Sequence, residues 1–253
     1  MPAPINRLKA QLLDGHLQKG LWMGLASGTV AEMASNAGFD WCLIDAEHGP
    51  NDLITIQSQL QAMNGALAEA VVRVPAAEDW MLKQVLDLGA QNVLIPMIDT
   101  AAQAADAVAA CRYPPSGKRG LGSALARASG YNAIPDYPTT ANDQICVMVQ
   151  AESRAAIDNI DAIAGTEGVD VVFIGPADLS ADMGYLGQLD APEVEEVIAH
   201  AIARIRAAEK VAGIVLFNPD DFPRYIDMGI GFLGMGSDVT SLAASLRDLA
   251  RSV

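Results

Sequence analysis

Two acidic residues each follow an apolar run in the middle of the chain. Residues 171–174 (VVFI) precede Asp178, and residues 145–149 (ICVMV) precede Glu152. An apolar run with no polar face is typical of a strand that is buried on both sides, as in a parallel sheet. Parallel α/β barrels carry their chemistry at the carboxyl ends of such strands. Glu152 and Asp178 are therefore candidates for one shared site.

Other predicted strand ends carry residues suited to charge and proton chemistry. One strand ends in Asp45, Glu47 and His48, and the next carries Arg73. Histidine changes its charge near neutral pH, so His48 is a natural proton carrier, and Asp45, three residues away, is the carboxylate that the sequence favours for orienting its ring. Arg73 would add a fixed positive charge. Each residue alone would also suit a helix cap or a surface ion pair, so the prediction depends on their convergence.

Two carboxylates without a cysteine partner favour a hard divalent cation over structural zinc. We expect Mg²⁺ or Mn²⁺ at Glu152 and Asp178, with Co²⁺ as a further candidate. Such an ion can chelate a 2-oxo acid and stabilise the enolate that forms from it. A Schiff-base aldolase would need a lysine inside the barrel, and none of the five lysines follows a predicted strand.

A glycine-rich segment, Gly234-Met235-Gly236-Ser237, ends the last predicted strand. A turn of this kind can bind a phosphate at the start of the next helix. It can equally serve only to permit a tight strand-to-helix turn. Both alternatives remain open from the sequence.

The pattern around these residues alternates between strands and helices. Strands are predicted at 21–25, 39–44, 70–74, 92–98, 145–151, 169–174, 211–216 and 231–235. Helices are predicted at 5–17, 29–36, 52–65, 78–88, 100–111, 153–164, 192–210, 220–228 and 239–251. Eight such units in one domain, residues 1–253, favour a closed (β/α)8 TIM barrel over a doubly wound sheet.

Residues 112–142 interrupt this alternation with many prolines and glycines. A long irregular segment in a compact domain is usually a lid, an interface arm or a disordered loop. We predict an ordered loop at a subunit contact.

Composition excludes several classes of partner. The net charge of −15 leaves no electrostatic footprint for nucleic acid or for an anionic membrane. No secretory leader and no apolar run of membrane-spanning length is visible, and three cysteines without metal-type spacing are read as reduced core residues. A cytoplasmic protein is expected.

Six segments, in the same order along nearly the whole chain, resemble the HpcH/HpaI aldolase family. They are residues 39–48 (FDWCLIDAEH), 72–75 (VRVP), 91–97 (QNVLIPM), 113–120 (YPPSGKRG), 150–153 (QAES) and 175–180 (GPADLS). The resemblance implies a metal-dependent class II pyruvate aldolase, typified by 4-hydroxy-2-oxoheptane-1,7-dioate and 2-dehydro-3-deoxyglucarate aldolases. It also implies a homohexamer, a dimer of trimers in which a C-terminal helix is exchanged between subunits.

The same resemblance assigns roles to individual residues. Glu152 and Asp178 would bind the metal, His48 would be the general base and Arg73 would stabilise the enolate. Asp178 would also contact the substrate, as would Gln150 and the backbone of Ala177. The carboxylate that makes the histidine more basic falls on Asp87, in preference to Asp45.

These observations predict an aldehyde-lyase that forms or cleaves 4-hydroxy-2-oxo acids from pyruvate or hydroxypyruvate and an aldehyde. Three alternatives remain at this point. A phosphosugar isomerase or epimerase would use residues 234–237 for phosphate, a CoA-ester lyase would bind CoA on a similar barrel, and a non-catalytic barrel would only bind a metal or ligand.

Overall fold

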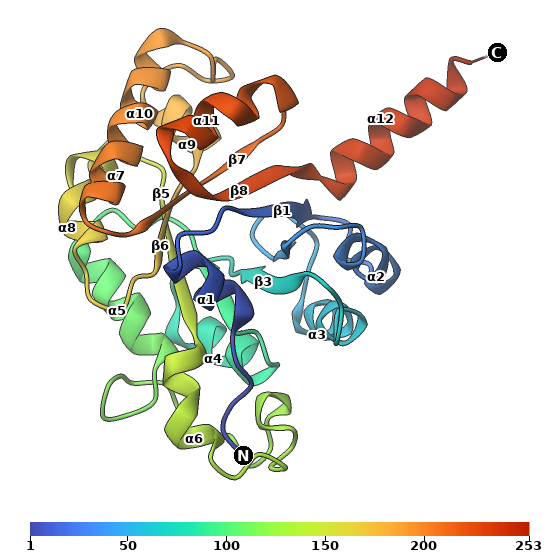
Figure 1. Ribbon diagram of the computed structural model, residues 1–253, viewed down its shortest axis with the longest axis vertical. Coiled ribbons are helices and arrows are strands. Elements are labelled where there is room, and N and C mark those ends of the chain that lie inside the picture. The colour runs from blue at the N-terminus through green and yellow to red at the C-terminus, as the bar shows by residue number, and fades with distance from the viewer. Residues whose placement is uncertain (253) are drawn as a thin grey trace.

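Eight parallel strands close into a barrel in the order of the sequence, each hydrogen-bonded to the next and β8 to β1. The computed structural model describes residues 1–252 (Figure 1). The strands are β1 (Gln18–Met23), β2 (Trp41–Asp45), β3 (Glu69–Arg73), β4 (Asn92–Ile95), β5 (Cys146–Ala151), β6 (Val171–Ile174), β7 (Val211–Leu216) and β8 (Ile230–Ser237). The predicted (β/α)8 barrel is confirmed.

Helices surround this barrel (Figure 1). They are α1 (Arg7–Leu13), α2 (Gly28–Ser35), α3 (Leu53–Ala62), α4 (Asp79–Asp87), α5 (Ala101–Cys111), α6 (Tyr137–Thr140), α7 (Arg154–Asp158), α8 (Ile160–Ala164), α9 (Pro176–Asp182), α10 (Pro192–Ala207), α11 (Phe222–Met228) and α12 (Asp238–Ala250). Short 3₁₀ turns, η1 (Arg127–Ser129), η2 (Ala141–Gln144) and η3 (Pro219–Asp221), complete the chain. No helix within residues 1–252 has the length and apolar character needed to cross a membrane.

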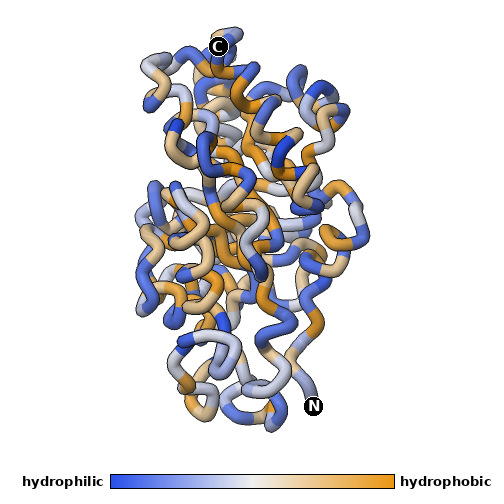
Figure 2. Tube along the Cα trace, turned by 90° about the vertical axis from the view of Figure 1, so that its left-hand side faces the viewer, coloured by the Kyte–Doolittle hydropathy of each residue, from blue (hydrophilic) through white to orange (hydrophobic). Residues whose placement is uncertain are grey.

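Apolar side chains fill two regions, the barrel interior and the layer between strands and helices. Figure 2 shows the hydrophobic segments gathered in the middle of the molecule. Inside the barrel, Trp41 stacks on Phe232 with ring centroids 4.0 Å apart and planes 8° from parallel. Gly20 leaves room for this pair, because a Cβ there would lie 1.9 Å from the Trp41 ring. Large rings opposite a glycine keep the interior close-packed.

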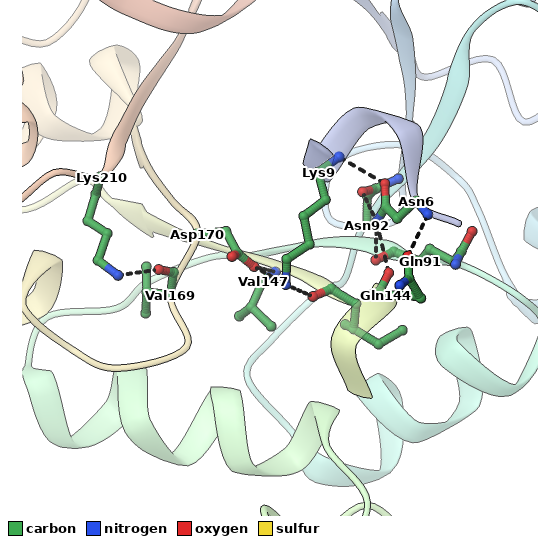
Figure 3. Close-up of polar contacts among 10 residues, drawn as sticks. Asn6, Lys9, Gln91, Asn92, Gln144, Val147, Val169, Asp170 and Lys210 are labelled. Carbon is green, nitrogen blue, oxygen red and sulfur yellow. Dashed lines mark hydrogen bonds and ion pairs between the residues drawn. The ribbon is translucent and has the colours of Figure 1, made fainter. Parts of the chain in front are cut away.

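Helix α1 closes the amino-terminal end of the barrel (Figure 3). Its apolar residues Leu8 and Leu12 join the inner core. Lys9 Nζ donates to the Ile145 carbonyl at 2.8 Å and lies 3.3 Å from the Asp170 carboxylate. The same carboxylate accepts the Val147 N–H at 2.9 Å. These contacts satisfy polar groups at the end of the barrel opposite to the predicted site.

Three predictions about the elements were wrong in detail. The strand predicted over 21–25 begins earlier, at Gln18, and includes Gly20, which leaves the Trp41 ring the space that it needs. The predicted helix over 153–164 is two helices, divided at Asn159, whose amide donates to the Asp99 carbonyl at 2.9 Å. Helix α9 was missed: Pro176 ends β6 and also starts this helix, at the first helical position that proline favours.

Residues 112–142 are ordered by a buried cation. Arg119 is 2% exposed, lies 4.3 Å from the Tyr113 ring centroid and donates to Asp87 at 2.7 Å. Tyr113 and Tyr137 are buried in the same cluster with Ala141. The segment is therefore packed against α4, as an ordered loop. Its predicted place at a subunit contact remains a prediction.

Candidate active site

The predicted site residues converge on one cavity at the carboxyl ends of the strands. The cavity has a volume of about 440 Å³. Its lining includes six residues predicted from the sequence: Asp45, His48, Arg73, Gln150, Ala177 and Asp178. Trp22 and Phe173 contribute an apolar wall. A concave, mostly apolar pocket with a few convergent polar groups is the expected form of a ligand site.

Glu152 follows directly on β5 and is 6% exposed. Its Oε1 accepts the Met97 N–H at 2.7 Å, and its Oε2 accepts a hydrogen bond from the Gln150 amide. Gly175 lies directly beside this carboxylate, since a Cβ at Gly175 would be 2.6 Å from Glu152 Oε2. Backbone and amide donors thus hold the carboxylate in one orientation, and the glycine gives it room.

The electrostatics of Glu152 favour a bound cation. Burial raises the pKa of this carboxyl, the hydrogen bonds from Gln150 and Met97 lower it, and the carboxylates of Glu47 and Asp178 raise it again. Asp178 reaches the same pocket from the first turn of α9. Within residues 1–252 no group of three or more His, Cys, Asp or Glu side chains is arranged as a metal cage. Within the same residues, the buried Gln150 Oε1 has no hydrogen-bond partner, and Gln150 lines the pocket together with Asp178.

Arg73 is fixed by two acidic side chains of the preceding strand and loop. Asp45 and Arg73 are register partners in the β2–β3 pair, so their side chains meet at the same rim. Arg73 donates from Nε and Nη2 to the two oxygens of Asp45, at 2.9 and 2.7 Å. Its Nη1 lies 2.8 Å from Glu47 Oε2, outside hydrogen-bond geometry, so this contact is electrostatic. Bidentate pairing of this kind sets the plane of the guanidinium.

The pKa values of the two acids are shifted in opposite directions. Burial alone would raise the pKa of Asp45, but the hydrogen bonds and charge of Arg73 outweigh it and hold the pKa below its usual value. For Glu47, burial is the largest effect and raises the pKa, with Arg73 and His48 acting against it. Asp45 is thus the firm partner of Arg73 and Glu47 the weaker one.

His48 lines the pocket from the loop between β2 and α3. Its backbone N–H donates to Asp45 Oδ1 at 3.3 Å, so Asp45 orients the loop and the arginine. Within residues 1–252, the imidazole makes no hydrogen bond to either predicted partner. Asp87 lies at the end of α4, bonded to Arg119 and outside the cavity of its own chain. The pairing of His48 with Asp87 remains a prediction.

Two contributors to the site were not predicted. Met97 has a φ of +57°, uncommon for a residue with a side chain, and this turn delivers the N–H that binds Glu152. Gly175 lies beside the Glu152 carboxylate and leaves it room, because a Cβ at this position would collide with it. A sequence carries no direct signal for either: the first is a backbone angle, the second a close approach between strands.

An eight-stranded parallel barrel with carboxylates, an arginine and a histidine at its carboxyl rim has the arrangement of a (β/α)8-barrel enzyme site. Comparison with known proteins gives the family. The model of the HpcH/HpaI aldolase/citrate lyase family matches residues 18–245. The chain belongs to this family, and it is an aldolase, a carbon–carbon lyase, as predicted.

Individual relatives are similar over nearly their whole length. A hydroxypyruvate/pyruvate aldolase of Agrobacterium fabrum (strain C58) is 54% identical over 250 residues, 99% of this chain and 94% of the relative. A 4-hydroxy-2-oxo-heptane-1,7-dioate aldolase of Shigella sonnei is 51% identical over 245 residues, 97% of this chain and 94% of the relative. The crystal structure of a family member from Burkholderia cenocepacia J2315 has a TM-score of 0.94 at 39% identity, covering 97% of this chain and 98% of that one.

Proposed function

We propose that this protein is a divalent-cation-dependent aldolase that joins pyruvate or hydroxypyruvate to an aldehyde and cleaves the resulting 4-hydroxy-2-oxo acid. The observation that carries the proposal is the convergence of Asp178, Arg73 and His48 on one cavity, with Glu152 held against Gln150 and Gly175 of its wall. The names of the relatives, hydroxypyruvate/pyruvate aldolase and 4-hydroxy-2-oxo-heptane-1,7-dioate aldolase, support the same substrates.

Glu152 and Asp178 would hold the cation, which we expect to be Mg²⁺ or Mn²⁺, with Co²⁺ as a further candidate. The donor set fits, because the carboxylates of Glu47 and Asp178 raise the pKa of the buried Glu152, as negative charges that a cation would offset, and the unpartnered Gln150 Oε1 lies in the pocket. A divalent ion supplies a Lewis acid that stabilises the negative charge of an enolate.

Side chains of the protein transfer the proton, stabilise the developing charge and position the substrate. His48 takes the proton from C3 of the 2-oxo acid, and the C3 carbon attacks the aldehyde carbon to form the new C–C bond. The alkoxide that results at C4 takes this proton back from His48, which restores the base, and cleavage follows the reverse order. Arg73, oriented by Asp45, places positive charge near the developing oxyanion. Gln150 and the Ala177 backbone position the 2-oxo acid, and Trp22 and Phe173 exclude water on the apolar side.

Release of pyruvate from a 4-hydroxy-2-oxo acid, followed with a coupled assay, tests this proposal. We expect EDTA to abolish the activity and added Mg²⁺ or Mn²⁺ to restore it. Activity that is indifferent to chelation would reject the role of the cation. Turnover of a CoA ester, or isomerisation without C–C cleavage, would instead favour the two enzymatic alternatives.

We further propose that the chain assembles as a homohexamer in which α12 is exchanged between subunits. Helix α12 projects away from the barrel (Figure 1) and contacts its own chain chiefly at β1 and β8. Its apolar residues Leu242, Leu246 and Leu249 are 48%, 56% and 70% exposed. A neighbouring subunit that covers this face would bury it, as large exposed apolar patches usually require.

A further inference from the structure

A second cavity lies at the amino-terminal end of the barrel, opposite the candidate active site. It has a volume of about 400 Å³ and lies between α1, the starts of β7 and β8, and the ends of α10 and α11. His16, Arg206 and Lys210 line it, and Leu12 and Ile226 are among the aliphatic side chains of its wall. We call this cavity the basic pocket.

The two cations of the basic pocket have no acidic partner, although acids are abundant in this protein. The chain carries 31 Asp and Glu residues against 16 Lys and Arg residues. Within residues 1–252, however, no Asp or Glu side chain lines the basic pocket, and neither Arg206 nor Lys210 forms an ion pair. The acids nearby in the sequence, Glu209 and Asp227, lie outside the lining. A cleft lined by charge of one sign concentrates ions of the opposite sign.

Backbone carbonyls of neighbouring segments hold both cations in place. Lys210 Nζ donates to the Val169 carbonyl at 2.8 Å (Figure 3), and Arg206 Nη1 donates to the Met228 carbonyl, at the end of α11, at 3.3 Å. Arg206 also lies against Gly229, where a Cβ would be 2.4 Å from its Nε. Cations at a helix end commonly bind the last carbonyls of their own helix, which is not the arrangement here. One neutral carbonyl each leaves most N–H donors of the guanidinium and the ammonium group free.

This lining fits an anion that carries an organic portion. A guanidinium group pairs with two phosphate oxygens at once, and the Lys210 ammonium group adds a second positive charge. The His16 imidazole can donate a further hydrogen bond. A phosphate monoester carries about two negative charges on one group, which two cations offset. The aliphatic wall and the volume of about 400 Å³ leave room for the organic portion of such a molecule.

We propose that the basic pocket binds an organic phosphate monoester, with the phosphate on Arg206 and Lys210 and the organic portion against Leu12 and Ile226. The pocket lies at the end of the barrel opposite to Asp178 and His48. Its ligand is therefore separate from both substrates of the proposed reaction. The proposal goes beyond the aldolase function and does not depend on it.

Phenyl phosphate is the probe, titrated calorimetrically into the full chain with Mg²⁺ and pyruvate present to occupy the active site. We expect one molecule bound per chain, at least fivefold more tightly than inorganic phosphate or phenol, because only the ester engages both parts of the pocket. Arg206→Gln and Lys210→Gln should each weaken binding about fivefold, the effect of losing one partly exposed charge contact. Lys83→Gln removes the same charge from an exposed position on α4, outside the lining, and should leave the affinity unchanged.

Wild type that binds no phenyl phosphate would overturn the proposal. So would unchanged affinity in Arg206→Gln and Lys210→Gln, or an equal loss in Lys83→Gln, which would indicate attraction by the surface as a whole. Displacement of the probe by added pyruvate would place it in the active site, and equal affinity for inorganic phosphate would reject an organic ligand. Should Lys210→Gln fail to fold by circular dichroism, the exposed Arg206→Gln decides the test with the same expected and contradicting results.

Discussion

The buried pair of Asp45 and Arg73 allows a quantitative prediction. Their side chains are 6% and 7% exposed and share two hydrogen bonds, at 2.9 and 2.7 Å. Breaking a buried ion pair by removing one charge typically costs about 3–5 kcal/mol, because the other charge is left uncompensated. Glu47 remains 2.8 Å from Arg73 and offsets part of this loss. For Asp45→Asn we therefore expect the free energy of unfolding to fall by about 3 kcal/mol, the lower end of that range.

The pH dependence of this stability contribution follows from the direction in which the pKa of Asp45 is shifted. The charge of Arg73 holds the pKa of Asp45 below its usual value despite burial. A carboxyl with a lowered folded-state pKa stabilises the fold above its unfolded pKa and loses this contribution as the pH falls through the folded value. The difference in unfolding free energy between wild type and Asp45→Asn should therefore be full at neutral pH and shrink below about pH 4.

Glu47→Gln is the matched control for Asp45→Asn. Burial raises the pKa of Glu47, so the folded protein already disfavours its charged form, and a neutral side chain should cost about 1 kcal/mol or less. Urea unfolding at one fixed protein concentration, followed by circular dichroism, measures both variants, since the stability of an oligomer depends on concentration. A larger loss for Glu47→Gln than for Asp45→Asn would refute the assignment of Asp45 as the firm partner of Arg73.

Three further predictions concern catalysis and assembly. His48→Ala should lower kcat by about 10²–10⁴-fold in the pyruvate-release assay, with the fold unchanged by circular dichroism; a loss under tenfold would remove His48 from proton transfer. Gly175→Ala places a Cβ 2.6 Å from Glu152 Oε2, so the Mn²⁺ concentration for half-maximal activity should rise at least tenfold, and an unchanged metal dependence would contradict the role of Glu152. Leu246→Asp, on the exposed face of α12, should lower the mass measured by light scattering below that of a hexamer, whereas a hexamer of unchanged stability would argue against the exchange of α12.

The barrel was predictable because each buried strand is a short apolar run at regular spacing, and because parallel strands deliver their carboxyl ends to one rim. That same rule predicts from the sequence that Asp45, His48 and Arg73 meet at one rim, and all three line the cavity. The pairing of Asp45 with Arg73 needed the β2–β3 register, which a sequence pattern does not carry. From the sequence, Asp45 was assigned to the imidazole of His48, and the structure instead bonds its carboxylate to Arg73 and to the backbone of the His48 loop.

Other features depend on contacts between distant segments. The left-handed turn at Met97 is held by Glu152, which lies 55 residues later in the chain. Gly20 lies within β1 because the Trp41 ring needs the space beside it. Asp238 accepts hydrogen bonds from Gly24 and Leu25, which lie more than 200 residues earlier in the chain. Local propensity cannot supply these, because each is decided by tertiary packing.

Direct titration of Mn²⁺ tests the central claim, that Glu152 and Asp178 share a single cation. Electron paramagnetic resonance of free Mn²⁺, with pyruvate present, would count the ions bound per chain. We predict one ion per chain for wild type and for the control Asp248→Asn, and at least a tenfold weaker affinity for both Glu152→Gln and Asp178→Asn. Undiminished Mn²⁺ binding by either of these two variants would contradict the account.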